Sequence, residues 1–231
     1  GHKMLNFFPM SNQRRILLLT LCLLVLSSLS FRQQKVIKVA CVGDSITYGS
    51  SIENREENSY PAQLQKLLGD GWEVQNFGVS GATMLKNGDK PYWKTEAFQQ
   101  ALAFESDVVI IKLGTNDSKP QNWAYAEAYE TDYRAMIQEF RGLESQPEIW
   151  ICLPVPVYEE HYGITSSVVD DEILPMIKRI KRAENVKTIN LYKALSKKAE
   201  MFPDGIHPDA AGAKVMAETI AKKIKKAGGQ P

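Results

Sequence analysis

Histidine is the scarcest side chain that could act as a base in this sequence. Of the three histidines, His2 lies in a Gly-His-Lys start that looks like a cloning remnant. His161 lies in the polar stretch Tyr-Glu-Glu-His-Tyr, where a solvated surface histidine is the simplest interpretation. His207 follows Asp204 by three positions, a spacing that lets the carboxylate reach the imidazole and fix its tautomer. Such a pair can also be a helix cap beside a surface histidine, so it needs a nucleophile nearby to indicate chemistry.

Two serines could supply that nucleophile. Ser45 lies in a Gly-Asp-Ser turn after the first apolar run, and Ser80 lies in Gly-Val-Ser-Gly after the second. Ser80 does not match the G-x-S-x-G elbow, because Ala82 occupies its last position. Hydrolysis through a serine also needs donors for the oxyanion. Asn116, in Gly-Thr-Asn-Asp after the third apolar run, could donate its side-chain amide there.

Alternating apolar and amphipathic segments must position these residues. Short runs rich in β-branched residues predict strands at 36–42, 72–77, 108–113, 148–153 and 186–189. Longer amphipathic stretches predict helices at 60–68, 95–104, 124–143, 168–182 and 209–226. This alternation predicts an α/β fold in which helices cover both faces of a parallel sheet. Because ligands bind at the carboxyl ends of such strands, we expect the candidate residues to meet at one edge.

Composition and charge exclude several classes of protein. The chain has 231 residues, of which 44% are hydrophobic and 24% charged, values that are ordinary for a globular domain. The formal net charge is +1, so we expect neither nucleic acid nor an anionic membrane surface as a partner. The sequence contains no CxxC or HExxH spacing. Cys41 and Cys152 lie in apolar runs, which favours buried thiols over a disulfide or metal ligands.

Residues 1–30 form a separate segment without acidic side chains. Two arginines precede the apolar run Ile16–Leu26, and small residues follow at the −3 and −1 positions of a cleavage site after Ser30. We therefore expect a secretory signal peptide and export of the mature protein, or a membrane anchor if the segment is not cleaved. One domain is expected over 31–231, and the sequence indicates no oligomeric state.

The four turn segments together resemble the conserved blocks of the SGNH hydrolases, also called the GDSL esterase/lipase family. Gly-Asp-Ser-Ile, Gly-Val-Ser-Gly-Ala-Thr, Gly-Thr-Asn-Asp and Asp-Gly-Ile-His-Pro occur in the family's order across about residues 36–225. The combination is specific, although each block alone is not. The resemblance implies a flavodoxin-like three-layer α/β/α sandwich with a five-stranded parallel sheet. It also implies hydrolysis of acyl esters without a metal or another cofactor.

The resemblance implies a role for each site residue. The residues that would act on the reacting ester are Ser45, Gly81, Asn116, Asp204 and His207. Ser45 would be the nucleophile, with His207 as its base and Asp204 orienting that base. The oxyanion donors would be the backbone N–H groups of Ser45 and Gly81 and the amide of Asn116, with Gly78 as the alternative to Gly81. We expect Asp44 and Asp117 to stabilise the turns through nearby backbone rather than to perform chemistry.

The stretches SYPAQLQKLL, NFGVSGATM and KLGTNDSKPQNW are most similar to bacterial carbohydrate O-acetylesterases of the sialate and xylan types. Aromatic residues crowd the expected loops and as a group suit stacking on sugar rings, namely Tyr48, Tyr60, Tyr92, Trp93, Trp123, Tyr125, Tyr158 and Tyr162. We therefore expect a secreted serine esterase that removes acetyl groups from carbohydrates. A lysophospholipase- or lipase-like esterase is the main alternative within the family.

Two other classes of function would use the same residues differently. A metal-dependent phosphoesterase could use Asp44, Asp117 and Asp204 as a carboxylate cluster, although dinuclear sites of this kind usually recruit several histidines. A sugar-binding module without activity could share the fold, because fold alone does not determine function. Loss of Ser45 or His207 would favour the binding module, and both residues are present. Hydrolysis of 4-nitrophenyl acetate with and without a chelator separates the three possibilities.

Overall fold

A computed structural model describes residues 35–227, so the expected signal segment and its cleavage site lie outside the described residues. In this range the strands are β1 (Ile37–Gly43), β2 (Trp72–Gly78), β3 (Val108–Lys112), β4 (Glu148–Leu153) and β5 (Lys187–Asn190). The α-helices are α2 (Ser45–Tyr48), α3 (Arg55–Asn58), α4 (Tyr60–Leu68), α5 (Glu96–Ala103), α6 (Pro120–Trp123), α7 (Tyr129–Arg141), α8 (Ser166–Val168), α9 (Leu174–Glu184), α10 (Leu191–Leu195) and α11 (Ala210–Ala227). None of the described helices is both long and apolar enough to cross a membrane.

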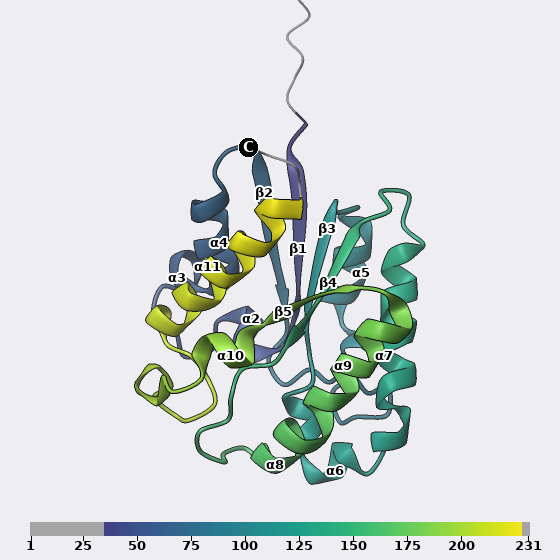
Figure 1. Cartoon of the computed structure of the whole chain (residues 1–231), viewed down its shortest axis with the longest axis vertical. Helices are drawn as coiled ribbons and strands as arrows, with labels where there is room; N and C mark the ends of the chain where they lie inside the picture. Colours follow the sequence, from purple (N-terminus) through teal and green to yellow (C-terminus); the bar gives the residue numbers. More distant parts are fainter. Residues whose placement is uncertain (1–34, 228–231) are drawn as a thin grey trace, which may run out of the picture. The chain divides into compact units, whose positions relative to one another are not determined.

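The strands form one five-stranded sheet in the order β2-β1-β3-β4-β5, and every pairing is parallel. This is the flavodoxin-like strand order. β2 lies on one side of β1, and β3, β4 and β5 follow on the other side, so the strand order reverses between β1 and β3. Helices α3, α4 and α11 lie on one face of the sheet, and α5, α7 and α9 lie on the other (Figure 1). The expected three-layer α/β/α fold is therefore confirmed.

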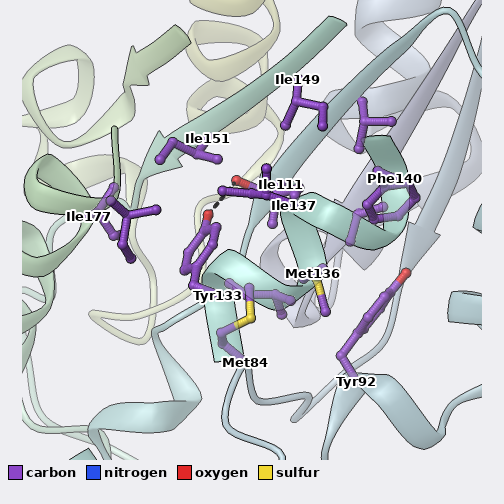
Figure 2. Packing of buried hydrophobic residues seen from close by; sticks show 14 of the residues in the cluster. Met84, Tyr92, Ile111, Tyr133, Met136, Ile137, Phe140, Ile149, Ile151 and Ile177 are labelled. Atoms are coloured by element: carbon purple, nitrogen blue, oxygen red, sulfur yellow. Dashed lines mark hydrogen bonds between the residues drawn. The ribbon is translucent and has the colours of Figure 1, made fainter. Parts of the chain in front are cut away.

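Each face of the sheet has its own hydrophobic core, and β1, β3 and β4, which are covered on both sides, are buried along most of their length. All five residues of β3 are buried. Figure 2 shows part of one core, where side chains of α7 face those of β3 and β4. Tyr133 and Ile137 are one helical turn apart on α7, and the hydroxyl of Tyr133 donates to the backbone oxygen of Ile111 over 3.3 Å. Tyr60 and Leu64 of α4 belong to the second core.

Cys41 and Cys152 are buried free thiols in this core region, as expected. Burial raises the pKa of the Cys41 thiol to about 12, outweighing the hydrogen bond with Tyr60 that lowers it. Both cysteines therefore act as small apolar side chains between the sheet and its helices.

Two expected helices differ from the observed elements. The stretch 124–143 contains a 3-10 turn at Ala126–Ala128 before α7 begins, and the stretch 168–182 begins with a π-helical turn at Val169–Ile173. The second difference has a local cause, because Pro175 near the start of α9 has no N–H to donate to the preceding turn. The short helices α2, α3 and α10 have too few turns to produce an amphipathic pattern, so no periodicity predicts them.

A fully buried ion pair joins the ends of β1 and β3. The Lys112 ammonium lies 3.1 and 3.0 Å from the two carboxylate oxygens of Asp44 and 2.9 Å from the hydroxyl oxygen of Thr115. Both charged side chains are 0% exposed. Asp44 also accepts the backbone N–H of Ile46 over 3.0 Å and thereby caps α2. The pair therefore fixes the turn that leads from β1 into α2.

A second buried carboxylate joins the loops after β2 and β3. Asp117 accepts the backbone N–H groups of Met84 and Leu85 over 3.0 and 2.8 Å. These groups belong to another loop, so Asp117 stabilises a contact between loops and not only its own turn. Burial raises the pKa of Asp117 to about 7, although the two backbone hydrogen bonds lower it. Asp117 therefore holds the segment after β2 against the segment after β3.

We expect Lys112→Met to lower the free energy of unfolding by about 3–5 kcal/mol, because the Asp44 carboxylate would stay buried without its partner. The double variant Asp44→Asn/Lys112→Met removes both charges and keeps a side-chain oxygen that can cap α2. It should therefore lose less stability than Lys112→Met alone. Urea unfolding of the three proteins, followed by circular dichroism, measures the difference. A double variant less stable than Lys112→Met would show that the unpaired charge is not the cause.

Candidate active site

Ser45, His207 and Asp204 form a continuous chain of hydrogen bonds at the carboxyl edge of the sheet. The His207 Nε2 atom lies 2.9 Å from the Ser45 hydroxyl oxygen, and its Nδ1 atom lies 2.7 Å from an Asp204 carboxylate oxygen. Ser45 is the first residue of α2, which follows β1 where the strand ends (Figure 1). His207 lies in the turn before α11. The fold therefore brings together residues that are 162 positions apart in the sequence.

Asp204 is held rigidly by the turn that it shares with His207. Its second carboxylate oxygen accepts the backbone N–H groups of Ile206 and His207 over 2.9 and 2.7 Å. Burial acts to raise the pKa of Asp204, but the hydrogen bonds from His207 and Ile206 outweigh it and hold this pKa below its usual value. An ionised carboxylate only accepts hydrogen bonds, so the Nδ1 atom of His207 carries the proton. The Nε2 atom is then free to accept the hydroxyl proton of Ser45.

The loop after β2 contains Gly81, whose backbone N–H is available as a donor. Gly81 has φ +82°, and among the described residues its N–H has no hydrogen-bond acceptor. The N–H of Gly78, the alternative, already donates to the Asn76 side chain over 2.9 Å. A Cβ atom on Gly78 would lie 2.2 Å from the backbone nitrogen of Tyr48, so this glycine lets β2 approach α2. The geometry therefore favours Gly81 over Gly78 as an oxyanion donor.

Asn116 is oriented toward the same loop. Its side-chain nitrogen donates to the backbone oxygen of Ala82 over 3.1 Å, which uses one of the two amide N–H groups. The residue is 4% exposed, so its amide is held in a mostly dry environment. The backbone N–H of Ser45, at the first position of α2, has no partner within the helix. These three N–H donors come from the ends of β1, β2 and β3.

The structure does not bring the other candidates to this site. The Ser80 hydroxyl is paired with that of Ser50 over 2.8 Å, and the described residues place no histidine on it. His161 is half exposed and lies 3.4 Å from the Glu159 carboxylate. Neither residue extends the chain of hydrogen bonds at Ser45.

The three carboxylates of the phosphoesterase hypothesis are engaged separately. Asp44 pairs with Lys112, and Asp117 and Asp204 accept backbone N–H groups of different loops. Within residues 35–227 no three His, Cys, Asp or Glu side chains are grouped to hold a metal ion. The arrangement therefore gives the phosphoesterase hypothesis no carboxylate cluster to build on.

A cavity of about 250 Å³ opens beside the imidazole of the site. Its lining contains no Leu, Ile, Val, Met or Phe and consists of Ser51, Tyr162, Pro203, Asp204, His207, Pro208 and Asp209. A larger cavity of about 470 Å³ lies between α3, α4 and β2 and contains none of the residues expected to catalyse. We therefore take the smaller cavity as the candidate binding site.

Lys112 is not among the residues that the turn motifs single out. Its signal is a lysine inside the otherwise apolar run 108–113, since a buried ammonium needs a carboxylate partner. The run does not identify that partner, because Asp44 lies 68 positions away.

Comparison with known proteins identifies the family to which this sequence is similar. Residues 41–215 match the GDSL-like Lipase/Acylhydrolase family. An acetylxylan esterase of Xylanibacter ruminicola is 41% identical over 218 residues, which cover 87% of this chain and 45% of that protein. The chain thus spans less than half the length of this curated relative.

Solved structures share the fold at low sequence identity. Est24, a carbohydrate acetylesterase from Sinorhizobium meliloti, aligns with TM-score 0.68 and 20% identity over 83% of this chain and 99% of its own. The inhibitor-bound aryl esterase of M. smegmatis aligns with TM-score 0.67 and 17% identity over 83% and 99%. These likenesses establish the fold alone, whereas the match over residues 41–215 covers most of the sequence. The chain therefore belongs to the GDSL-like lipase/acylhydrolase family, a family of ester hydrolases.

Proposed function

We propose that this protein is a serine esterase that removes acetyl groups from carbohydrates. The observation that carries the proposal is the unbroken hydrogen-bond chain from Ser45 through His207 to Asp204, with distances of 2.9 and 2.7 Å. A nucleophile, a base and a group that orients the base are the minimum for acyl transfer to a hydroxyl.

In the first half of the reaction Ser45 attacks the ester carbonyl while His207 takes its proton at Nε2. The carbonyl oxygen gains negative charge as the tetrahedral intermediate forms. His207 then gives the proton to the leaving sugar oxygen, and the bond between the acyl carbon and this oxygen breaks. Asp204 stays ionised throughout and stabilises the imidazolium. The acetyl group remains on Ser45 as an ester.

In the second half a water molecule attacks the acetyl-serine. His207 takes a proton from this water and returns one to the Ser45 oxygen when acetate leaves. During both halves the N–H groups of Ser45, Gly81 and Asn116 donate to the negative oxygen. Because the surrounding loops fix these donors before the reaction begins, little reorganisation is needed as charge develops.

Three observations support a short acyl group on a sugar. The relative from Xylanibacter ruminicola is an acetylxylan esterase. The cavity beside His207 contains no Leu, Ile, Val, Met or Phe side chain, so it suits a polar sugar better than a long acyl chain. Its lining includes a tyrosine and two prolines, with Ser51 and Asp209 adding polar groups. Export of the protein stays a prediction from residues 1–30.

The nucleophile is tested by paired serine variants. We expect Ser45→Ala and His207→Ala each to lower kcat on 4-nitrophenyl acetate by roughly 10³-fold or more, because triad members act as a unit. Ser80→Ala is the matched control, since Ser80 also lies in a turn after a strand but is bonded to Ser50. Activity that survives in Ser45→Ala and is lost in Ser80→Ala would reverse the assignment. Sensitivity of the wild-type protein to a chelator would favour the metal mechanism instead.

Removing the amide of Asn116 should affect the transition state more than substrate binding. We expect Asn116→Ala to lower kcat by about 10²-fold with little change in KM. Steady-state kinetics on the same ester separates the two parameters. A variant with normal kcat and a raised KM would place Asn116 in substrate binding rather than in the oxyanion hole.

Acyl-chain length tests the acetyl preference. A channel that buried each methylene would add about 0.8 kcal/mol per group and favour longer esters. Because the cavity offers no such channel, we expect 4-nitrophenyl acetate to be the best substrate, butyrate clearly worse and octanoate near background. Rates are measured below the micelle concentration by release of nitrophenol. A maximum at six carbons or longer would contradict the acetylesterase and favour the lysophospholipase.

A further inference from the structure

The structure separates the loop aromatics into packed and open rings. Tyr60 and Tyr92 are fully buried, and Trp93, Trp123 and Tyr158 pack against the cores. The exposed tyrosines are Tyr48, Tyr125 and Tyr162, at 36%, 42% and 67% exposure. The guanidinium of Arg55 covers the ring of Tyr48 at 3.9 Å. Tyr125 and Tyr162 are therefore the tyrosines with open rings among the described residues.

Of these two, Tyr162 lies beside the catalytic residues. Its ring centroid is 6.0 Å from that of His207, and it lines the cavity that contains His207 and Asp204. The described residues include no ring contact between Tyr125 and the triad. Of these two tyrosines, Tyr162 is therefore the one that lines the cavity next to His207 and can contact a molecule bound there.

The loop that carries Tyr162 is attached to the catalytic turns at both ends. At its start, the backbone N–H of Tyr158 donates to the oxygen of Gly205 over 2.8 Å, inside the Asp204–His207 turn. At its end, the N–H of Thr165 donates to the Ser118 hydroxyl over 3.1 Å, just after Asn116. The position of the Tyr162 ring is therefore coupled to the turns that hold the triad and the oxyanion donor.

The backbone at this position favours a smaller residue than tyrosine. Tyr162 has φ +57° and Gly163 has φ +78°, and the N–H of Ile164 closes the turn by donating to the oxygen of His161 over 2.9 Å. The left-handed region suits glycine and asparagine, whereas a bulky side chain there is uncommon and strained. An exposed aromatic ring kept in a strained conformation next to a catalytic group points to a functional use of the ring.

The cavity has the chemistry of a sugar site. A pyranose presents C–H groups on its two faces and hydroxyls around its edge. The ring of Tyr162 and the side chains of Pro203 and Pro208 offer rigid apolar surfaces, and Ser51 and Asp209 offer polar atoms at the same cavity. A ring stacked on Tyr162 would lie beside His207, whose Nε2 atom is 2.9 Å from the Ser45 hydroxyl oxygen.

We propose that Tyr162 forms a carbohydrate subsite, on which the sugar that carries the acetyl group stacks while Ser45 attacks the ester. This inference rests on the proposed function and adds the residue that distinguishes a sugar ester from a simple alkyl acetate. Tyr162 contacts the substrate but takes no part in proton transfer.

The test compares two acetate esters in two variants. Tyr162→Asn removes the ring and suits the left-handed backbone, whereas Tyr162→Phe keeps the ring. The substrates are acetylated xylo-oligosaccharides and ethyl acetate, which has neither a sugar nor an aromatic group, and released acetic acid is titrated at constant pH. We expect Tyr162→Asn to lower the ratio of kcat/KM for the sugar ester over ethyl acetate by roughly fivefold or more. The loss should fall mainly on KM, and Tyr162→Phe should restore the wild-type ratio.

Two controls exclude a structural explanation. Tyr162→Asn should melt at the wild-type temperature or higher, because asparagine relieves the strain at φ +57°. Tyr125→Asn, which removes another exposed tyrosine, should keep the wild-type ratio. An unchanged ratio in Tyr162→Asn, or an equal fall in Tyr125→Asn, would overturn the inference. If the wild-type protein hydrolyses ethyl acetate but no acetylated sugar, the proposed function fails instead, and this result does not depend on any Tyr162 variant.

If the wild-type protein hydrolyses no acetylated sugar, a binding measurement decides whether the carbohydrate subsite exists. In a Ser45→Ala background, titration calorimetry with xylotetraose, which has no acetyl group, reports contact with the sugar alone. We expect binding that weakens roughly fivefold or more when Tyr162→Asn is added. Equal affinity in the two proteins, or no binding in either, would overturn the carbohydrate subsite.

Discussion

The buried pair between Lys112 and Asp44 is the contact on which the site depends. Lys112 ends β3 and is paired in register with Gly43 of β1, so the two strands meet where the order of the sheet reverses. An ammonium and a carboxylate with 0% exposure are costly to bury unless they pair with each other. The same carboxylate caps α2 one position before Ser45. The ion pair therefore also fixes the position of Ser45, the proposed nucleophile.

The remaining parts of the site are attached to this turn by short polar contacts. The N–H of Val79 donates to the backbone oxygen of Gly43 over 2.9 Å. The side-chain amide of Asn116, in the loop after β3, donates to the backbone oxygen of Ala82, in the loop after β2. Contacts of this kind keep donors in position before substrate arrives, which is how a preorganised site lowers the barrier. The Tyr162 loop is attached to the same turns, so the position of the Tyr162 ring and the orientation of His207 are linked through shared backbone contacts.

The fold could be predicted from the sequence because buried parallel strands and amphipathic helices have different periods. Strand positions agree within one or two residues, as β3 at Val108–Lys112 shows for the expected 108–113. Helix starts were less accurate wherever a short turn or Pro175 changed the hydrogen bonding. The turn motifs predict Ser45, Asp204 and His207 as parts of one site, and the structure joins these three side chains by hydrogen bonds. The sequence does not identify Asp44 as the partner of Lys112, because the two residues are 68 positions apart. It also does not single out Tyr162 among the eight aromatic residues, because exposure of a ring has no local sequence pattern.

The proposed mechanism requires that Ser45 becomes acylated while His207 takes its proton. Diethyl 4-nitrophenyl phosphate reacts with an activated serine and leaves its phosphoryl group on the attacking oxygen. Mass spectrometry of the treated protein and of its peptides therefore locates the nucleophile. We expect one diethylphosphoryl group per chain, located on the peptide that contains Ser45, and almost none when His207 is replaced by alanine. Modification of Ser80, or an unmodified protein that still hydrolyses acetate esters, would contradict it.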